Sequence, residues 1–192
     1  MLSMTEKVTL RQNIERYEGK VKHMYLDSKG FVTVGVGHLL KDVAAATHLP
    51  FEAANGALAS EAEIVKAFEQ VSVQESNRVA SYYQQFTDLV LADKDIDHLT
   101  DKHIDTFYHE LTVVYDGFEV FPSKVKLALC DMIFNLGMTG LRKKWPKMNA
   151  CIAAKDWKAT AENCQRKGIA DERNDYVKSL FLTSAGVGGL AG

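Results

Sequence analysis

The sequence has few prolines, which interrupt helices and strands, and few cysteines, which can form disulfides. It contains three prolines and three cysteines among 192 residues. Cys130, Cys151 and Cys164 are odd in number and lack metal-ligand spacing, which argues against a disulfide framework and a zinc site. We therefore expect them to pack as small apolar residues. The six histidines do not cluster, so we expect no metal and no other cofactor.

Strong charge and long apolar runs are also lacking. The formal net charge is −2, which gives no electrostatic reason to expect nucleic acid or an anionic membrane as a partner. No apolar run reaches the length of a membrane span, and the first residues lack the apolar core of a signal peptide. A length of 192 residues suits one domain, which has one or two lobes.

A small antiparallel sheet is predicted near the N-terminus of a chain that otherwise has helical periodicity. Residues 8–18 predict an amphipathic helix. Asp27 and Gly30 delimit a predicted β-turn, because Asp suits its first position and Gly permits a positive φ. Residues 31–34 favour a strand by propensity.

The rest of the chain predicts helices. Ser60 and Glu63 fit a capping box that opens one of them. The periodicity resumes further on, so this is either one long helix or two helices with a break near residues 71–76. Thr100 is predicted as the N-cap of another helix, and Gly137 as the end of a later one. Further helices are predicted at residues 140–153, 157–166 and 171–182, followed by a frayed tail from Ser184.

These patterns predict an α+β, mainly helical fold in a single domain. A small N-terminal sheet lobe would cover about residues 15–70, and a C-terminal helical lobe about residues 71–185. A cleft between two such lobes is the usual place for a ligand.

Two carboxylates and a hydroxyl come from neighbouring predicted elements. Eight residues separate Glu18 from Asp27, and five separate Asp27 from Thr33. A hairpin can fold Asp27 and Thr33 back towards the helix end that carries Glu18. Two carboxyl groups across a cleft are what hydrolysis of a glycosidic bond requires, one as acid and one as base. The alternative is local: Glu-Gly at a helix end and Asp in a β-turn are common for structural reasons alone.

The segment YEGKVKHMYLDSKGFVTVGVGHLL resembles the active-site segment of the phage-type muramidases, the T-even lysozyme group of glycoside hydrolase family 24. Their motif continues after the Thr with Gly-x-Gly-His, matched here at Gly35, Gly37 and His38. The segments NGALASEAEIVKAF, LALCDMIFNLGMTG, AAKDWKATAEN and ERNDYVKSLFLTSAG are similar to later parts of the family. Residues 74–118 are not covered and form an extended middle segment, which implies an extra helix or helical hairpin in the C-terminal lobe.

The resemblance implies a lysozyme that hydrolyses the β-1,4 bond between N-acetylmuramic acid and N-acetylglucosamine in peptidoglycan, with inversion. By position, Glu18 would be the general acid, and Asp27 would hold the attacking water as general base, aided by Thr33. Room for that water implies carboxyl groups about 6.5–9.5 Å apart.

The resemblance also implies supporting residues, each with a plainer alternative. Arg173 matches an arginine that would orient the acid through an ion pair, although the sequence alone favours a surface residue. Leu39 and Phe134 match positions that line the substrate site, but they could also be packing residues. Asn135 stands where the family often has Gln. His38 is expected to anchor the hairpin by hydrogen bonding.

Two other functions stay open: a lytic transglycosylase, which needs only one acid, and a cell-wall-binding module without catalysis. We expect a monomer that acts on glycan strands of the bacterial wall in the periplasm. It would reach them either as a phage endolysin released through a membrane lesion or as a secreted effector or bacteriocin. An effector would imply an immunity protein as a partner.

Overall fold

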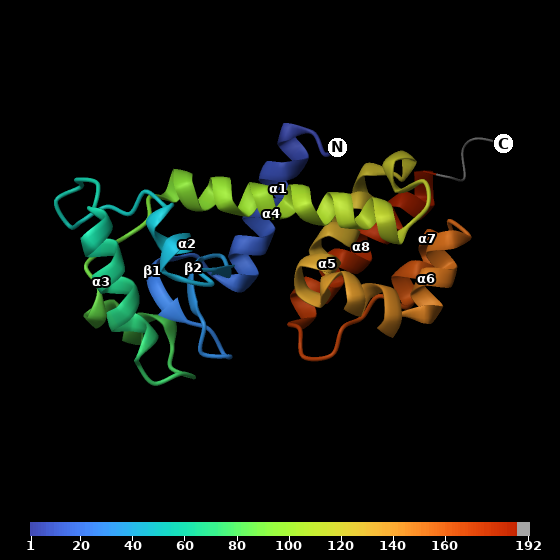
Figure 1. Cartoon of the computed structure of the whole chain (residues 1–192). Coiled ribbons are helices and arrows are strands. Elements are labelled where there is room, and N and C mark those ends of the chain that lie inside the picture. The colour runs from blue at the N-terminus through green and yellow to red at the C-terminus, as the bar shows by residue number, and fades with distance from the viewer. Residues whose placement is uncertain (188–192) are drawn as a thin grey trace. The chain divides into compact units, whose positions relative to one another are not determined.

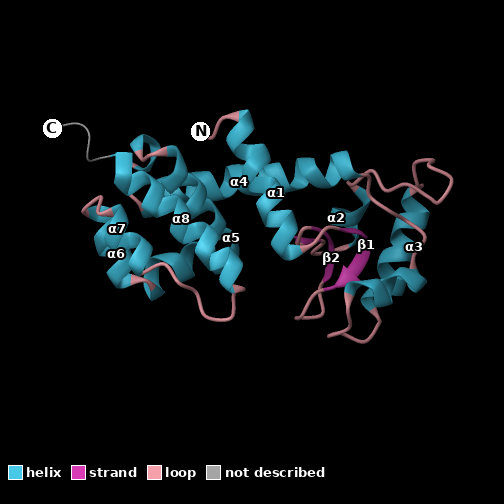
Figure 2. Cartoon of the chain, turned by 180° about the vertical axis from the view of Figure 1, so that it is seen from behind, coloured by secondary structure: helices cyan, strands magenta, loops and turns pink. Residues whose placement is uncertain are grey.

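A computed structural model of the chain describes residues 1–187 and has one small sheet among helices (Figures 1 and 2). The predicted α+β, mainly helical fold is confirmed. The chain divides into two compact units. The sheet unit is Ile14–Lys102, and the helical unit combines Met1–Asn13 with the chain from His103 onward. The division falls later than the boundary expected near residue 70, so the extended middle segment contributes to both units.

Helix α1 (Met4–Glu18) begins before the predicted residue 8. Its start is explained by a capping box, in which Ser3 Oγ accepts from the Glu6 N–H at 3.3 Å and the Glu6 carboxylate accepts from the Ser3 N–H at 2.7 Å. It ends where Gly19 adopts a φ of 81° and donates its N–H to the Glu15 carbonyl.

The sheet follows directly after α1. Its strands are β1 (Val21–Leu26), β2 (Val32–Gly35) and β3 (His38–Leu39), antiparallel in the order β1-β2-β3. On one face the sheet contributes to the core of the unit through Met24, Leu26, Val32 and Val34, all buried. The pairing of Tyr25 with Thr33, and of Thr33 with Leu39, places these three side chains together on the other face.

Two predictions for the middle segment are wrong. The capping box of Ser60 and Glu63 does open α3 (Glu61–Ser72), but neither a long helix nor a second α-helix follows. Residues Ala80–Phe86 instead form a 3₁₀ helix, η1, after Asn77 takes a left-handed conformation with a φ of 61°. Thr100 is no N-cap: it lies inside α4 (Asp93–Val114), where its buried hydroxyl donates to the Ile96 carbonyl at 3.0 Å. The sheet unit also contains α2 (Val43–Thr47).

Helices alone form the remainder of the helical unit. The span α5 (Ser123–Lys144) consists of two helical segments that meet at a kink, where Gly137 has a non-helical φ of 66° and ψ of 163°, so the predicted helix end at Gly137 is confirmed. The other elements are η2 (Phe118–Val120), α6 (Pro146–Ala153), α7 (Trp157–Glu162) and α8 (Asp171–Val187). The expected tail is helical from Ser184 to Val187, and its remaining residues, 188–192, lie outside the described chain.

The three cysteines are free thiols in the structure. Cys130 and Cys164 are buried, and burial raises the pKa of the Cys130 thiol to about 12, which makes it unreactive. Cys151 is only half-buried. Within residues 1–187, no helix combines the length and apolar character needed to cross a bilayer.

Candidate active site

The hairpin and the helix before it carry all three groups predicted to be catalytic. Glu18 is the last residue of α1 and is exposed. Asp27 follows β1 in the turn, and Thr33 lies in β2. All three therefore belong to the sheet unit.

The end of α1 is fixed by an ion-pair cluster around Lys20. The Lys20 ammonium lies 2.6 Å from Asp97 of α4 and 3.0 Å from Glu15 of α1. Burial alone would lower the pKa of Lys20, but hydrogen bonds to Asp97 and Glu15 raise it. Since Lys20 stands two residues after Glu18, this cluster holds the backbone that presents the acid.

Backbone amides of the turn orient the Asp27 carboxylate. Its Oδ1 accepts from the N–H of Lys29 at 2.8 Å and from the N–H of Phe31 at 2.9 Å. The turn is closed by the Asp27 N–H, which donates to the Phe31 carbonyl, and by the Gly30 N–H, which donates to the Asp27 carbonyl. Both side-chain bonds use the same oxygen, so they orient the carboxylate without using Oδ2.

Thr33 is fixed as an acceptor. Its side chain is only 2% exposed, and its hydroxyl donates to the Phe31 carbonyl at 3.0 Å. The single hydroxyl proton is thereby used in the hydrogen bond within the hairpin. The oxygen lone pairs remain able to accept a hydrogen bond from another group.

Tyr25 joins these groups and was missed in the sequence. Burial raises the pKa of Tyr25, and the negative charges of Asp27 and Glu18 raise it further. A hydrogen bond from the backbone of Gly37 acts on this pKa in the opposite direction. Tyr25 therefore lies within electrostatic reach of both carboxylates. Its position two residues before Asp27 in a strand was the available signal.

The glycines and histidine of the motif shape the β2–β3 connection. Gly35 and Gly37 have φ values of 68° and 80°. A Cβ on Gly35 would lie 3.1 Å from Cγ2 of Ile96, so glycine is required there for close packing as well. His38 of β3 pairs with Val34 of β2, and its role as an anchor of the hairpin remains a prediction. Leu39 is 47% exposed, on the face that carries Tyr25 and Thr33.

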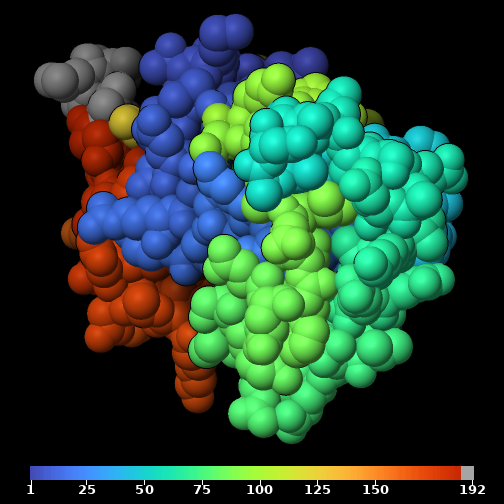
Figure 3. Space-filling model, turned by 90° about the vertical axis from the view of Figure 1, so that its left-hand side faces the viewer, coloured from blue at the N-terminus to red at the C-terminus, as the bar shows by residue number. Residues whose placement is uncertain are grey.

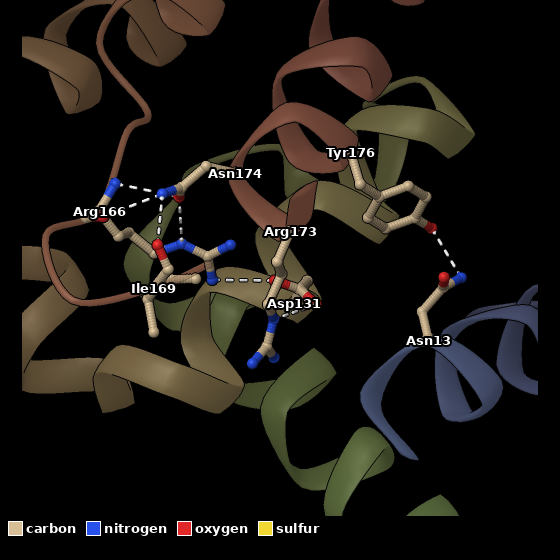
Figure 4. Close-up of polar contacts among 7 residues, drawn as sticks. All are labelled: Asn13, Asp131, Arg166, Ile169, Arg173, Asn174 and Tyr176. Atoms are coloured by element: carbon tan, nitrogen blue, oxygen red, sulfur yellow. Dashed lines mark hydrogen bonds and ion pairs between the residues drawn. The ribbon is translucent and has the colours of Figure 1, made fainter. Parts of the chain in front are cut away.

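Arg173 belongs to a buried charge cluster in the helical unit (Figure 4). Its Nε lies 3.1 and 3.2 Å from the two carboxylate oxygens of Asp131, which also accepts from Arg166 Nη1 at 2.9 Å. Asn174 accepts from Arg166 and returns a hydrogen bond to the Arg166 carbonyl. Arg173 is only 3% exposed, so the surface alternative is wrong. Orientation of the acid by Arg173 remains a proposal.

Phe134 and Asn135 are half-buried on α5, also in the helical unit. The Phe134 ring meets the edge of Phe107 from α4 at 5.6 Å, and Phe107 stacks on His103 at 6.2 Å. Burial lowers the pKa of His103. The sequence did not predict that the rings of His103, Phe107 and Phe134 lie in contact, although His103 and Phe107 have the four-residue spacing of one helix face.

A metal centre has no donor set in the described chain, where no three His, Cys, Asp or Glu side chains are grouped to hold an ion.

Comparisons with known proteins show the fold. No family model and no curated protein matches the sequence. Among solved structures, the chain is similar to a crystal structure of a P22 lysozyme mutant, with a TM-score of 0.57 and 16% sequence identity. The match covers 95% of this chain and 98% of that one. The fold is lysozyme-like.

Proposed function

We propose that this chain is a peptidoglycan hydrolase that cleaves the β-1,4 bond between N-acetylmuramic acid and N-acetylglucosamine with inversion. The observation that carries the proposal is the placement of two carboxylates in the sheet unit, with Glu18 exposed at the end of α1 and Asp27 oriented in the turn by two backbone amides. Two such carboxylates, in a lysozyme-like fold, fit the acid and base of a glycosidase.

Glu18 is the proposed general acid. Its carboxyl group transfers a proton to the glycosidic oxygen as the bond to the anomeric carbon breaks. Its exposure at the end of α1 leaves it accessible to a polymeric substrate.

Asp27 and Thr33 together hold the proposed nucleophilic water. The water donates one hydrogen bond to Asp27 Oδ2 and another to Thr33 Oγ1, which points an oxygen lone pair at the anomeric carbon. As the water attacks from the face opposite the leaving group, Asp27 takes its proton, and the configuration inverts. This geometry requires carboxyl groups about 6.5–9.5 Å apart.

Glycan contacts are proposed for each unit separately. Leu39 contributes an exposed apolar side chain beside Thr33, and Phe134 with Asn135 contributes a ring and an amide. Arg173, held by Asp131, is a proposed supporting residue.

The decisive experiment adds the pure protein to cell-wall sacculi and measures turbidity and released muropeptides. Glu18→Gln and Asp27→Ala should each lower kcat by about 100- to 10,000-fold, because each removes a proton-transfer group. Glu69→Gln, which neutralises an exposed Glu on α3, is the matched control and should leave the rate unchanged. Full release by Glu18→Gln would disprove the assignment of the acid.

The products separate the alternatives. Inverting hydrolysis gives a reducing muramic acid that is first formed as the α anomer, which NMR detects before it equilibrates. An anhydro sugar in the mass spectrum would identify a lytic transglycosylase, because that reaction adds no water. Binding to sacculi without any release would identify a module without catalysis.

The biological setting proposed is the periplasmic cell wall of a host or target cell, reached through a phage membrane lesion or by specialised secretion. The extended middle segment favours a secreted effector with an immunity protein as partner. Export of the chain to the periplasm should lyse the producing cell, whereas retention in the cytoplasm should not, and co-expression of a neighbouring immunity gene should protect it.

A further inference from the structure

We infer that residues 74–91, which connect α3 to α4, brace the hairpin that carries Asp27, and that His23 is the positioning residue through which this brace acts. The catalytic consequence of the inference rests on the proposed function. Its structural basis lies entirely within the sheet unit.

The brace lies close to the turn itself. A Cβ built on Gly30 would lie 3.6 Å from Cβ of Ser76, which is ordinary van der Waals contact. Ser76 therefore backs the turn three residues after Asp27. In the space-filling view, the green brace lies beside the blue hairpin (Figure 3).

The brace also holds the strand that leads to Asp27. His23 of β1 is buried, and its Nε2 lies 2.9 Å from the carbonyl oxygen of Ala80 in η1. A carbonyl only accepts, so Nε2 carries the proton and donates it. One residue earlier, the Lys22 carbonyl accepts from the Leu91 N–H at 2.8 Å. The brace thus engages the outer edge of β1, which is the edge strand of the sheet.

Hydrogen bonds and an ion pair hold the brace, within itself and to Glu52. Tyr83 is fully buried, and its hydroxyl donates to the Glu75 carbonyl at 2.8 Å. The Glu75 carboxylate pairs with Arg78 at 2.7 Å. Near the end of the brace, Val90 and Glu52 exchange two backbone hydrogen bonds of 2.9 and 2.7 Å.

These contacts fix β1 and its turn at Lys22, His23 and Gly30, on both sides of the residues that lead to Asp27. A general base must stand within a fraction of an ångström of its place, and a 1 Å displacement costs up to about 100-fold in rate. The brace therefore affects turnover more than substrate binding.

The test compares His23→Leu, which removes the donor, with His23→Gln, which keeps an N–H donor. His23→Leu should lower kcat on sacculi about 10-fold with little change in KM, and His23→Gln should recover most of the loss. Hydrogen exchange at the Lys29 and Phe31 amides, which bind Asp27 Oδ1, should accelerate in His23→Leu and return towards the native rate in His23→Gln.

Thr100→Val is the matched control, because it also removes one buried side-chain hydrogen bond from the sheet unit without touching the brace. It should lower the Tm without changing exchange at Lys29 and Phe31. The inference is overturned if His23→Leu behaves like this control. If His23→Leu does not fold, Tyr83→Phe carries the same expectation. An inactive native protein would disprove the proposed function, whereas the exchange rates would still decide on the brace.

Discussion

At the scale of single residues, Tyr25 connects the parts of the candidate site. Its hydroxyl oxygen is bound by the backbone of Gly37, in the β2–β3 turn, while its ring comes from β1. Because burial and the neighbouring carboxylates raise the pKa of Tyr25, the hydroxyl stays protonated at neutral pH. Its proton is then available to a carboxylate or to a sugar hydroxyl.

Tyr25→Phe should lower kcat about 10-fold, which corresponds to the loss of one hydrogen bond. The loss should be constant across neutral pH, since Tyr25 does not titrate there. Steady-state kinetics on sacculi at several pH values measure it. The matched control is Tyr108→Phe, which removes a buried hydroxyl that has no hydrogen-bond partner in the described part of the chain. An equal effect of the two substitutions would contradict a specific role for Tyr25.

The sequence predicted residues whose role depends on local spacing, and it missed those whose role depends on pairing. Glu18 falls at a helix end and Asp27 in a turn, as their neighbours indicated. Spacing from Asp27 marks Tyr25 as a candidate, but its place beside Thr33 depends on the strand register, which spacing alone does not fix. The burial of Arg173 depends on Asp131, which is distant in sequence.

At the scale of elements, the β2–β3 connection packs closely against α4. Gly35 has a φ of 68°, and a Cβ placed on it would lie 3.1 Å from Cγ2 of Ile96, so it is constrained by both backbone and space. Gly56 has a similar φ of 79°, but nothing lies within 4 Å of a Cβ placed there.

Gly35→Ala should therefore destabilise the protein more than Gly56→Ala. Both substitutions place Ala in a left-handed conformation, at a cost of about 1–2 kcal/mol. Only Gly35→Ala adds crowding against Ile96, for a further cost of about 1–3 kcal/mol. Urea unfolding of the two variants measures the difference, and equal free energies of unfolding would show that α4 moves aside without cost.

Element boundaries were predictable where a cap marks them. Ser60 with Glu63 gave the start of α3 correctly, and Ser3 with Glu6 is the same signal, which was overlooked. Thr100 misled because a threonine hydroxyl binds the carbonyl four residues earlier as readily as it caps a helix. The apolar spacing in η1 resembled an α-helix, but α3 ends at Ser72, and η1, which follows the left-handed Asn77, is a 3₁₀ helix.

At the scale of the whole molecule, α1 and α4 each begin in one unit and end in the other. The first thirteen residues therefore belong with a helical unit that is otherwise built from the chain beyond His103. Lys7 pairs with Asp105 at 2.5 Å within this unit, and Asn13 donates to the Tyr176 hydroxyl (Figure 4). Such discontinuity is invisible to local sequence patterns, which explains why the lobes were expected to follow one another along the chain.

Leu10→Ala and Ile14→Ala should each destabilise a different unit. Both side chains are fully buried, one turn apart on α1, and each truncation should cost about 2–5 kcal/mol. Because Leu10 belongs to the helical unit and Ile14 to the sheet unit, native-state hydrogen exchange should accelerate first in α8 for Leu10→Ala and first in β1 for Ile14→Ala. Identical exchange patterns would mean that the units unfold as one.

The outer edge of β1 has a consequence beyond catalysis. An open strand edge is a template on which other chains can add, strand by strand, into fibres. The Leu91 amide already occupies the Lys22 carbonyl on this edge. The hairpin that bears the candidate base therefore cannot pair with another chain at this point. At high protein concentration, this edge is less able to start aggregation.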